Sequence, residues 1–240
     1  MSPKQRFRCA TLLLLATAPA MAGISADATR IIFMASDAKW GKSIGLTSSA
    51  ASLSPYLVKV QVTRDMQGQP TQVPFVITPS LFRLEPATTH QVRLMKTPGN
   101  QPQDRESLFY FRSVAMPAGT ADTSSSRPAV SGALQVATAT VIKLFYRPDG
   151  LAMPQPQAMS KLQFSAGKQG LNVTNPTPYY ITLHRLRVGN TPVTLRVDDG
   201  SSMIAPYAST TYHNAPRSGT VEWTAINDYG GMEVFHGTVQ

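Results

Sequence analysis

Residues 134–148 read LQVATATVIKLFYRP, and this stretch decides the fold. Its side chains alternate as in a β-strand, and β-branched residues fill much of the run. Lys143 stands near its end, and Pro148 stops the pattern because proline cannot donate a backbone hydrogen bond to a sheet. One face carries five side chains, which are Leu134, Val136, Thr138, Thr140 and Ile142. The stretch fits an ordinary core strand of a sandwich, and it equally fits a strand offered to a partner.

Shorter alternating runs lie on both sides of this stretch, separated by Pro, Gly and Ser. Before it, they occupy residues 29–33, 56–62, 72–78, 90–94 and 108–114. After the turn at 147–150, they occupy residues 162–164, 170–173, 179–188, 192–197, 202–204, 219–226 and 232–237. Such spacing is typical of antiparallel sandwiches, and no convincing helix interrupts it. We therefore predict an all-β chain with two immunoglobulin-like β-sandwich domains, arranged as a boomerang with an interdomain cleft.

The first 22 residues have the pattern of a secretory signal peptide. Basic residues at positions 4, 6 and 8 precede an apolar stretch at 10–16, and Ala20-Met21-Ala22 places small residues where a signal peptidase cleaves. We predict cleavage after Ala22. The chain then divides into a signal peptide (1–22), an N-terminal domain (23–148) and a C-terminal domain (149–240).

Composition argues against several classes of protein. Only 15% of the 240 residues are charged, yet no run approaches the roughly 20 apolar residues of a membrane-spanning helix, so we expect no membrane insertion. Cleavage would remove Cys9, which is the only cysteine, and three basic residues, lowering the formal net charge from +9 to +6 (9 − 3). The mature chain would then have no thiol and no disulfide. It has no Lys/Arg run and no aromatic stacking motif, so we expect no nucleic-acid partner.

Several apparent motifs carry no chemistry. Residues 41–45, GKSIG, match the G-x-S-x-G pattern around Ser43, but a nucleophile elbow needs a helix after it, and residues 46–49 are not helical in character. The same segment fails as a phosphate loop because Ser36 stands where the first glycine belongs. The four histidines, His90, His184, His213 and His236, lack metal-ligand spacing and are expected on the surface or in strands. We expect no enzyme, no cofactor and no metal.

Four separate motifs resemble one protein family. They are PQDRESLFYF (102–111), IKLFYRP (142–148), NPTPYY (175–180) and INDYGG (226–231). In order and in coverage of both predicted domains, they resemble the periplasmic pilus chaperones of the PapD type. The resemblance implies a periplasmic chaperone of a Gram-negative bacterium that binds and folds pilin subunits by donor-strand complementation. Such a chaperone caps the subunits and delivers them to an outer-membrane usher for pilus assembly.

The resemblance also implies how a subunit is held. Arg30 and Lys143 match the two cations that bind the C-terminal carboxylate of a pilin in the interdomain cleft. Two neighbouring cations repel each other, and a carboxylate would complete them through charge-assisted hydrogen bonds. The donor strand would then face the subunit groove with the five side chains of the opening stretch: Leu134, Val136, Thr138, Thr140 and Ile142.

A second group implied by the resemblance is structural. Glu106, Arg147 and Asp228 match the charged residues that bridge the two domains and set their angle. A buried bridge is poor evidence for stability but can specify orientation. We therefore assign these three residues to cleft geometry rather than to ligand binding.

The sequence departs from the family pattern at three places. Thr138 stands where the family usually has a large apolar residue, so we expect weaker or differently selective filling of that pocket. Thr78-Pro79-Ser80 replaces a pair of prolines, which leaves open whether the peptide bond before Pro79 is cis. Residues 118–133 are rich in Ser, Thr, Ala, Gly and Pro and are predicted to form a mobile loop. Their intermediate length, with no cysteine in the mature chain, favours the short-loop branch of the family.

Two other functions stay open from the sequence. A structural or adhesive component of the same pathway should carry a donor extension after the signal, and residues 23–28 are too short and polar for one. A secreted esterase would use Ser43. The sequence also leaves open whether the free chaperone protects its strand by self-association.

Overall fold

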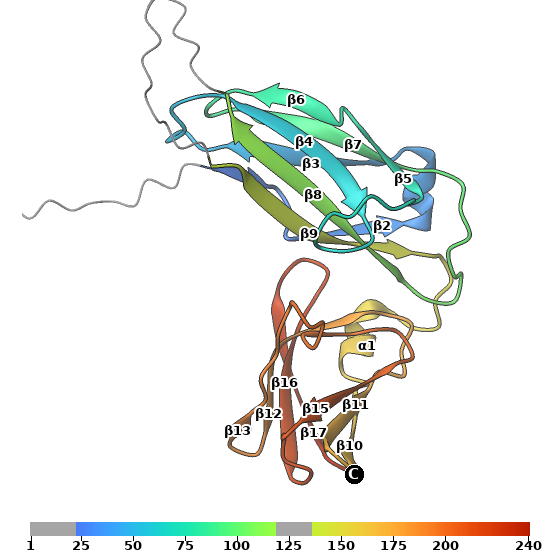
Figure 1. The fold of residues 1–240 in the computed structure, drawn as a ribbon. Coiled ribbons are helices and arrows are strands. Elements are labelled where there is room, and N and C mark those ends of the chain that lie inside the picture. The colour runs from blue at the N-terminus through green and yellow to red at the C-terminus, as the bar shows by residue number, and fades with distance from the viewer. Residues whose placement is uncertain (1–22, 119–135) are drawn as a thin grey trace, which may run out of the picture.

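The computed structural model describes residues 23–118 and 136–240, which fold into two β-rich lobes joined just after strand β9 (Thr138–Arg147). Figure 1 shows the lobes set at an angle to one another. Within the described residues, no helix is long and apolar enough to cross a membrane. The signal-peptide prediction, Leu134 and most of the predicted mobile loop lie outside the described residues.

The N-terminal lobe is a sandwich of two sheets with one core. The first sheet has the order β1 (Ile24–Ala26), β3 (Lys42–Ser48), β7 (Thr89–Lys96), β5 (Phe75–Thr78). The second has the order β2 (Arg30–Met34), β9, β8 (Ser107–Pro117), β4 (Tyr56–Thr63), β6 (Leu81–Leu84). Alternate side chains of both sheets point inward, and Phe33, Phe75 and Phe109 meet edge to face, with ring centroids 5.3 and 5.1 Å apart.

The C-terminal lobe repeats this construction around a separate core. One sheet contains β10 (Gln163–Gly167), β11 (Gly170–Thr174) and β15 (Ser209–His213). The other has the order β13 (Thr191–Pro192), β12 (Ile181–Val188), β16 (Thr220–Ile226), β17 (Met232–Thr238), with β14 (Met203–Ile204) also paired to β12. Trp223 fills the centre of the core and donates its indole N–H to the carbonyl of Met159 over 3.0 Å. The prediction of an all-β chain with two immunoglobulin-like sandwiches is confirmed.

Strand β9 has neighbours along only part of its length. On one side it pairs antiparallel with β8 from Thr138 to Tyr146. On the other side it pairs in parallel with β2, and this pairing covers only residues 143–147. Within the described part of the chain, no strand pairs with that second edge at residues 138–142. The backbone groups along this edge are therefore open to a further strand.

Some predicted elements differ in the structure. The strand predicted at 192–197 is reduced to β13, because the following residues leave the sheet in a loop that returns at Ser202. Two short helical segments interrupt the strands, the 3-10 helix Ala35–Lys39 and α1 (Gln155–Met159). The peptide bond before Pro79 is cis.

The structure contradicts the esterase alternative. Ser43 lies within β3, opposite Arg93 of β7, and the strand continues to Ser48. A nucleophile elbow places its serine on a sharp turn between a strand and a helix, and neither feature occurs here. GKSIG is therefore a piece of sandwich strand.

Candidate functional site

Two cations face each other at the start of β2. Arg30 is the first residue of β2, and Lys143 is its partner in the parallel register with β9. Partners in register project toward the same face of a sheet, and here that face is turned toward the C-terminal lobe. The structure thus brings together the two residues predicted to bind a carboxylate.

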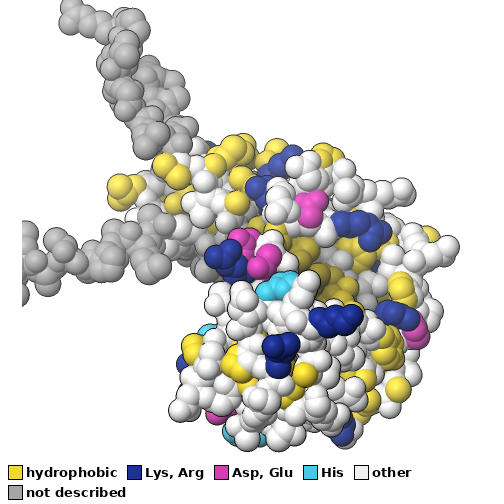
Figure 2. All heavy atoms as spheres, turned by 60° about the horizontal axis from the view of Figure 1, so that its bottom comes forward, with side chains coloured by type: hydrophobic (Ala, Val, Ile, Leu, Met, Phe, Trp, Pro, Cys, Tyr) yellow, Lys and Arg dark blue, Asp and Glu magenta, His cyan; other side chains and the backbone are white. Residues whose placement is uncertain are grey.

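Both cations line a cleft of about 500 Å³ between the lobes. The N-terminal lobe contributes Thr29, Arg30, Val141 and Lys143, and the C-terminal lobe contributes Thr182, Leu183, His184, Leu195, Val197, Ser202, Ile226 and Gly230. Figure 2 shows apolar side chains at depth between the lobes, with basic, acidic and histidine side chains around them. No acidic side chain is among the described residues that line the cleft.

Neither member of the cation pair forms a direct ion pair within the described chain, although the charges of Asp228 and Glu106 act against the lowering of the Arg30 pKa. Arg30 donates from Nη1 to the carbonyl of Ile226 over 3.0 Å, but its buried Nε has no hydrogen-bond partner there. None of the ion pairs among the described residues includes Arg30 or Lys143. Burial lowers the pKa of both groups, and repulsion by Arg30 adds to the effect on Lys143, whose pKa falls to about 8. An anion in the cleft would relieve this repulsion.

A buried three-residue bridge joins the lobes beside the cleft. Arg147 donates from Nε to Glu106 Oε1 over 2.8 Å and holds the Asp228 carboxylate through two bonds of 2.7 and 2.8 Å. Glu106 Oε2 also accepts the backbone N–H of Tyr180 over 2.9 Å. Burial raises the pKa of Glu106 to about 7, although Arg147 and the Tyr180 N–H act in the opposite direction. The structure brings together all three residues predicted to bridge the lobes.

Strand β9 contributes Arg147 to the bridge from its outward-facing side. Its inward residues Ile142, Leu144 and Tyr146 belong to the N-terminal core, so the alternating residues 143, 145 and 147 face the boundary between the lobes. Phe145 contacts Tyr180 of the C-terminal lobe with ring centroids 5.7 Å apart. One strand thereby supplies a cleft cation, an interlobe contact and the central arginine of the bridge.

The hairpin between β16 and β17 completes the boundary. Its tip points toward the N-terminal lobe in Figure 1. Asn227 shapes the tip by accepting the backbone N–H groups of Tyr229 and Gly231 over 3.1 and 2.8 Å. Gly230 has a φ of +83° and lies so close to the N-terminal lobe that a Cβ would stand 2.7 Å from Thr29 Oγ1. Only glycine fits this position without strain.

The predicted donor-strand residues divide into three groups. Val136 and Thr138 are exposed, and Thr140 is partly exposed. Ile142 is only 5% exposed and packs in the N-terminal core, so its side chain does not point toward a partner. Leu134 lies outside the described residues.

Sequence reasoning placed only Arg30 and Lys143 in the cleft and did not place His184 there. The pairing of β12 with β16 shifts register between Leu183 and Arg185, so His184 is the extra residue of a β-bulge. It lines the cleft together with Arg30 and Lys143. The sequence carries no signal for this position because a bulge depends on how two distant strands pair.

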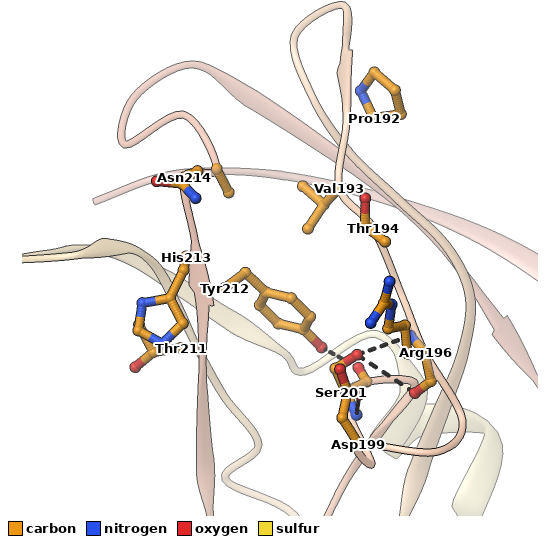
Figure 3. A pocket seen from close by; sticks show the side chains of 11 residues that line it. Pro192, Val193, Thr194, Arg196, Asp199, Ser201, Thr211, Tyr212, His213 and Asn214 are labelled. Atoms are coloured by element: carbon orange, nitrogen blue, oxygen red, sulfur yellow. Dashed lines mark hydrogen bonds between the residues drawn. The ribbon is translucent and has the colours of Figure 1, made fainter.

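A second hollow, of about 540 Å³, lies within the C-terminal lobe and contains none of the predicted site residues. Figure 3 shows that its polar groups bond mainly to one another. Tyr212 donates its hydroxyl to the carbonyl of Ser201 over 2.7 Å, and Ser201 Oγ accepts the backbone N–H of Arg196 over 2.8 Å. These bonds fix the loop that follows β13. Among the described residues, no cluster of His, Cys, Asp or Glu has the composition of a metal site.

The fold and the site define a class of protein: a two-lobed sandwich with an open strand edge that leads to a pair of cations in the interlobe cleft. The chain belongs to the family of PapD pili assembly chaperones. Residues 23–152 match the family model of the pili and flagellar-assembly chaperone PapD N-terminal domain, and residues 157–235 match that of the PapD C-terminal domain. This is a family of chaperones, which is not an enzymatic role.

Individual relatives cover nearly the whole chain. The probable fimbrial chaperone protein ElfD of Escherichia coli K12 is 34% identical over 226 residues, which span 92% of this chain and 90% of ElfD. The chaperone protein FimC of the same strain is 32% identical, over 89% of this chain and 83% of FimC. Among solved structures, the E. coli chaperone DraB is 30% identical with a TM-score of 0.74, over 91% of this chain and 97% of DraB.

Proposed function

We propose that this chain is a periplasmic chaperone that captures pilin subunits, lends each one a strand, and delivers it to an outer-membrane usher. The observation that carries the proposal is the continuity of two features. The open edge of β9 at residues 138–142 leads directly to Lys143 and Arg30. One partner segment that ends in a carboxylate could therefore use both features at once.

The geometry defines the direction of such a segment. Its carboxylate would lie at Arg30 and Lys143, and its preceding residues would run back beside residues 142 to 138. This makes the segment parallel to β9 and in line with β2, which is itself parallel to β9 and begins at Arg30. Main-chain bonds along the edge would supply affinity, and the carboxylate would fix the register.

The side chains of the lent strand continue the inner face of the lobe. Ile142 closes the chaperone's own core, and Thr140, Thr138 and Val136 extend the same face beyond it. Leu134 would continue the series by its place in the sequence. A pilin that lacks a strand exposes an apolar groove and a bare sheet edge, both of which promote aggregation. These side chains would enter that groove.

The comparisons support a pilin as the partner. The chaperone SafB was solved in complex with the Salmonella enterica SafA pilin, and this chain is 28% identical to the matched structure, with a TM-score of 0.73 over 91% of its length. The periplasmic chaperone SfaE, another similar solved structure, is 30% identical to this chain with a TM-score of 0.72. The usher and cleavage after Ala22 are proposed by family analogy. A structural or adhesive role is not favoured, because the named relatives are chaperones along both lobes.

The test is replacement of Lys143 by Met, which keeps an unbranched chain but removes the charge. We expect Lys143→Met to abolish co-purification of a pilin that the co-expressed wild-type protein retains, while circular dichroism shows both lobes folded. Lys59→Met, on an exposed position of the same sheet, is the matched control and should retain the pilin. A Lys143→Met protein that retains as much pilin as the wild type would refute the carboxylate anchor.

A further inference from the structure

His184 occupies a place that an ordinary strand residue would not. In β12 it is the bulged residue between Leu183, which pairs with Ala225, and Arg185, which pairs with Thr224. A bulge leaves one residue without a cross-strand partner and redirects its side chain. His184 is exposed, and its side chain lines the interlobe cleft from the C-terminal lobe.

The groups around the cleft leave the imidazole without a partner. Across from it, β2 and β9 present Arg30 and Lys143, and its own lobe presents the apolar Leu195 and Val197 and the hydroxyl of Ser202. None of the side-chain hydrogen bonds or ion pairs found among the described residues uses His184. No carboxylate lines the cleft in the same part of the chain. Of the acidic groups near Arg30, Glu106 and Asp228 are bound to Arg147, and the exposed Asp198 and Asp199 lie in the loop between the lining residues Val197 and Ser202.

We propose that His184 is a third binding group for the C-terminal carboxylate of the captured subunit and donates an N–H to it from the wall opposite Arg30 and Lys143. The inference rests on the proposed function and deepens it. A carboxylate accepts about four hydrogen bonds, so two cations on one side leave acceptor capacity on the other. His184 thus adds a third binding group, on the opposite wall of the cleft, to the site for a chain terminus.

The other charged groups near the cleft are the same in the wild type and in a variant of His184. Arg30 stays charged, and Lys143 is already mostly charged below its pKa of about 8. Glu106, whose pKa is about 7, also changes charge near neutral pH, and its charge acts on Arg30. The contribution of His184 to binding is therefore measured as the difference in peptide affinity between the wild type and a variant at that position.

The probe is a synthetic peptide with the sequence of the last strand of a pilin that co-purifies with the wild-type chaperone. It is made once with a free carboxylate and once with a C-terminal amide. Binding of both forms is measured by calorimetry at about pH 6, where Lys143 is charged. The proteins are the wild type, His184→Gln, His184→Leu and the control His213→Leu. His213 is exposed in the same lobe but lines the other hollow.

We expect His184→Leu to reduce the preference for the acid over the amide by about tenfold, as loss of one hydrogen bond to a charged group implies. His184→Gln, whose side chain can still donate an N–H, should keep part of the preference. His213→Leu should behave as the wild type. If the wild type prefers the acid and both His184 variants keep the full preference, the inference about His184 is wrong while the anchor stands. If the wild type does not distinguish acid from amide, both fail.

Discussion

Lys143 is a charged side chain held where charge is unfavourable. Burial and the neighbouring Arg30 lower its pKa to about 8. A carboxylate bound beside it would favour the charged form and raise its pKa again. Binding a subunit above about pH 8 must therefore take up a proton.

This linkage predicts how capture depends on pH. The affinity contributed by Lys143 should be constant well below its pKa of about 8 and should fall as the pH rises through that value, by at most about tenfold per pH unit. Calorimetric titration of wild-type protein with the acid-terminated peptide between about pH 7 and pH 10 would measure it. In Lys143→Arg the cation stays charged over this range, so the decline should disappear. An identical decline in Lys143→Arg would contradict the assignment.

The residues of the site were predictable to different degrees. Arg30 and Lys143, and the bridge of Glu106, Arg147 and Asp228, came from motif resemblance, and the structure brings each set together. His184 was treated as an ordinary strand histidine. Its role as a cleft residue depends on a register shift against a strand about forty residues away, and no local pattern encodes that shift.

At the scale of elements, β9 packs in the N-terminal core at its C-terminal end and is exposed at its N-terminal end. Leu144 and Tyr146 are buried in the N-terminal core, whereas Val136 and Thr138 are exposed. The exposed end has no need to pack against its own lobe. Its sequence is therefore free to suit a partner, which explains how Thr138 can occupy a position on the core-facing side.

We expect Thr138→Val to strengthen subunit capture. Valine has the same shape as threonine but avoids burying a hydroxyl in an apolar groove, which should gain about 1 kcal/mol, or roughly fivefold in affinity. Ala139→Val is the matched control, because Ala139 is equally exposed but points to the opposite face. Dissociation of the purified chaperone–pilin complex in each variant provides the measurement. Equal changes in both variants would show that side-chain direction does not matter here.

The hairpin between β16 and β17 offers a second test at this scale. Gly230→Ala would force a side chain into Thr29 of the other lobe, so it should displace the hairpin and weaken capture as well as stability. Gly189→Ala also places alanine at a positive φ, with no atom within 4 Å of its Cβ. It should cost a similar backbone strain of about 1–2 kcal/mol and leave capture unchanged. Urea unfolding and pilin co-purification distinguish the two; equal capture by both variants would argue against a role of the hairpin.

The sequence predicted most strands and missed four. Alternation located β4, β8, β9 and β16 to within a few residues. It did not reveal β1 or β6, which are only three and four residues long, β3, which contains Gly45, or β15, in which polar residues dominate. Strands β3 and β15 are stabilised by pairing with β7 and β11 rather than by their own apolar pattern. The short α1 was missed because its five residues are too few to show a helical period.

At the scale of the whole molecule, the angle between the lobes depends on the bridge at Arg147. Arg147 lies at the end of the first lobe, and Asp228 lies on the hairpin of the second. Glu106 reaches the same arginine and the backbone of Tyr180, so it contacts both lobes as well. Because its side chain is only 2% exposed, its ionisation is coupled to the closure of the boundary.

The raised pKa of Glu106 gives a stability prediction with a definite sign. Its folded-state pKa of about 7 lies above the ordinary value of 4.5, so the stability it contributes is complete below the ordinary value and is lost as the pH rises through about 7. Relative to Glu106→Gln, which does not titrate, the wild type should therefore lose stability between about pH 5 and pH 8. Urea unfolding of both proteins across this range measures the difference. A constant difference would show that Glu106 keeps an ordinary pKa.

The uncompensated cation pair has a thermodynamic consequence for the free protein. Folding brings Arg30 and Lys143 together and withdraws both from water before any anion is present. The free fold is therefore less stable than the same fold without one of these charges, and a bound carboxylate returns the difference as affinity. Lys143→Met, which we expect to abolish capture, should then raise the melting temperature of the free chaperone at neutral pH. The same pair of charges would thus increase the affinity for the subunit and decrease the thermal stability of the free chaperone.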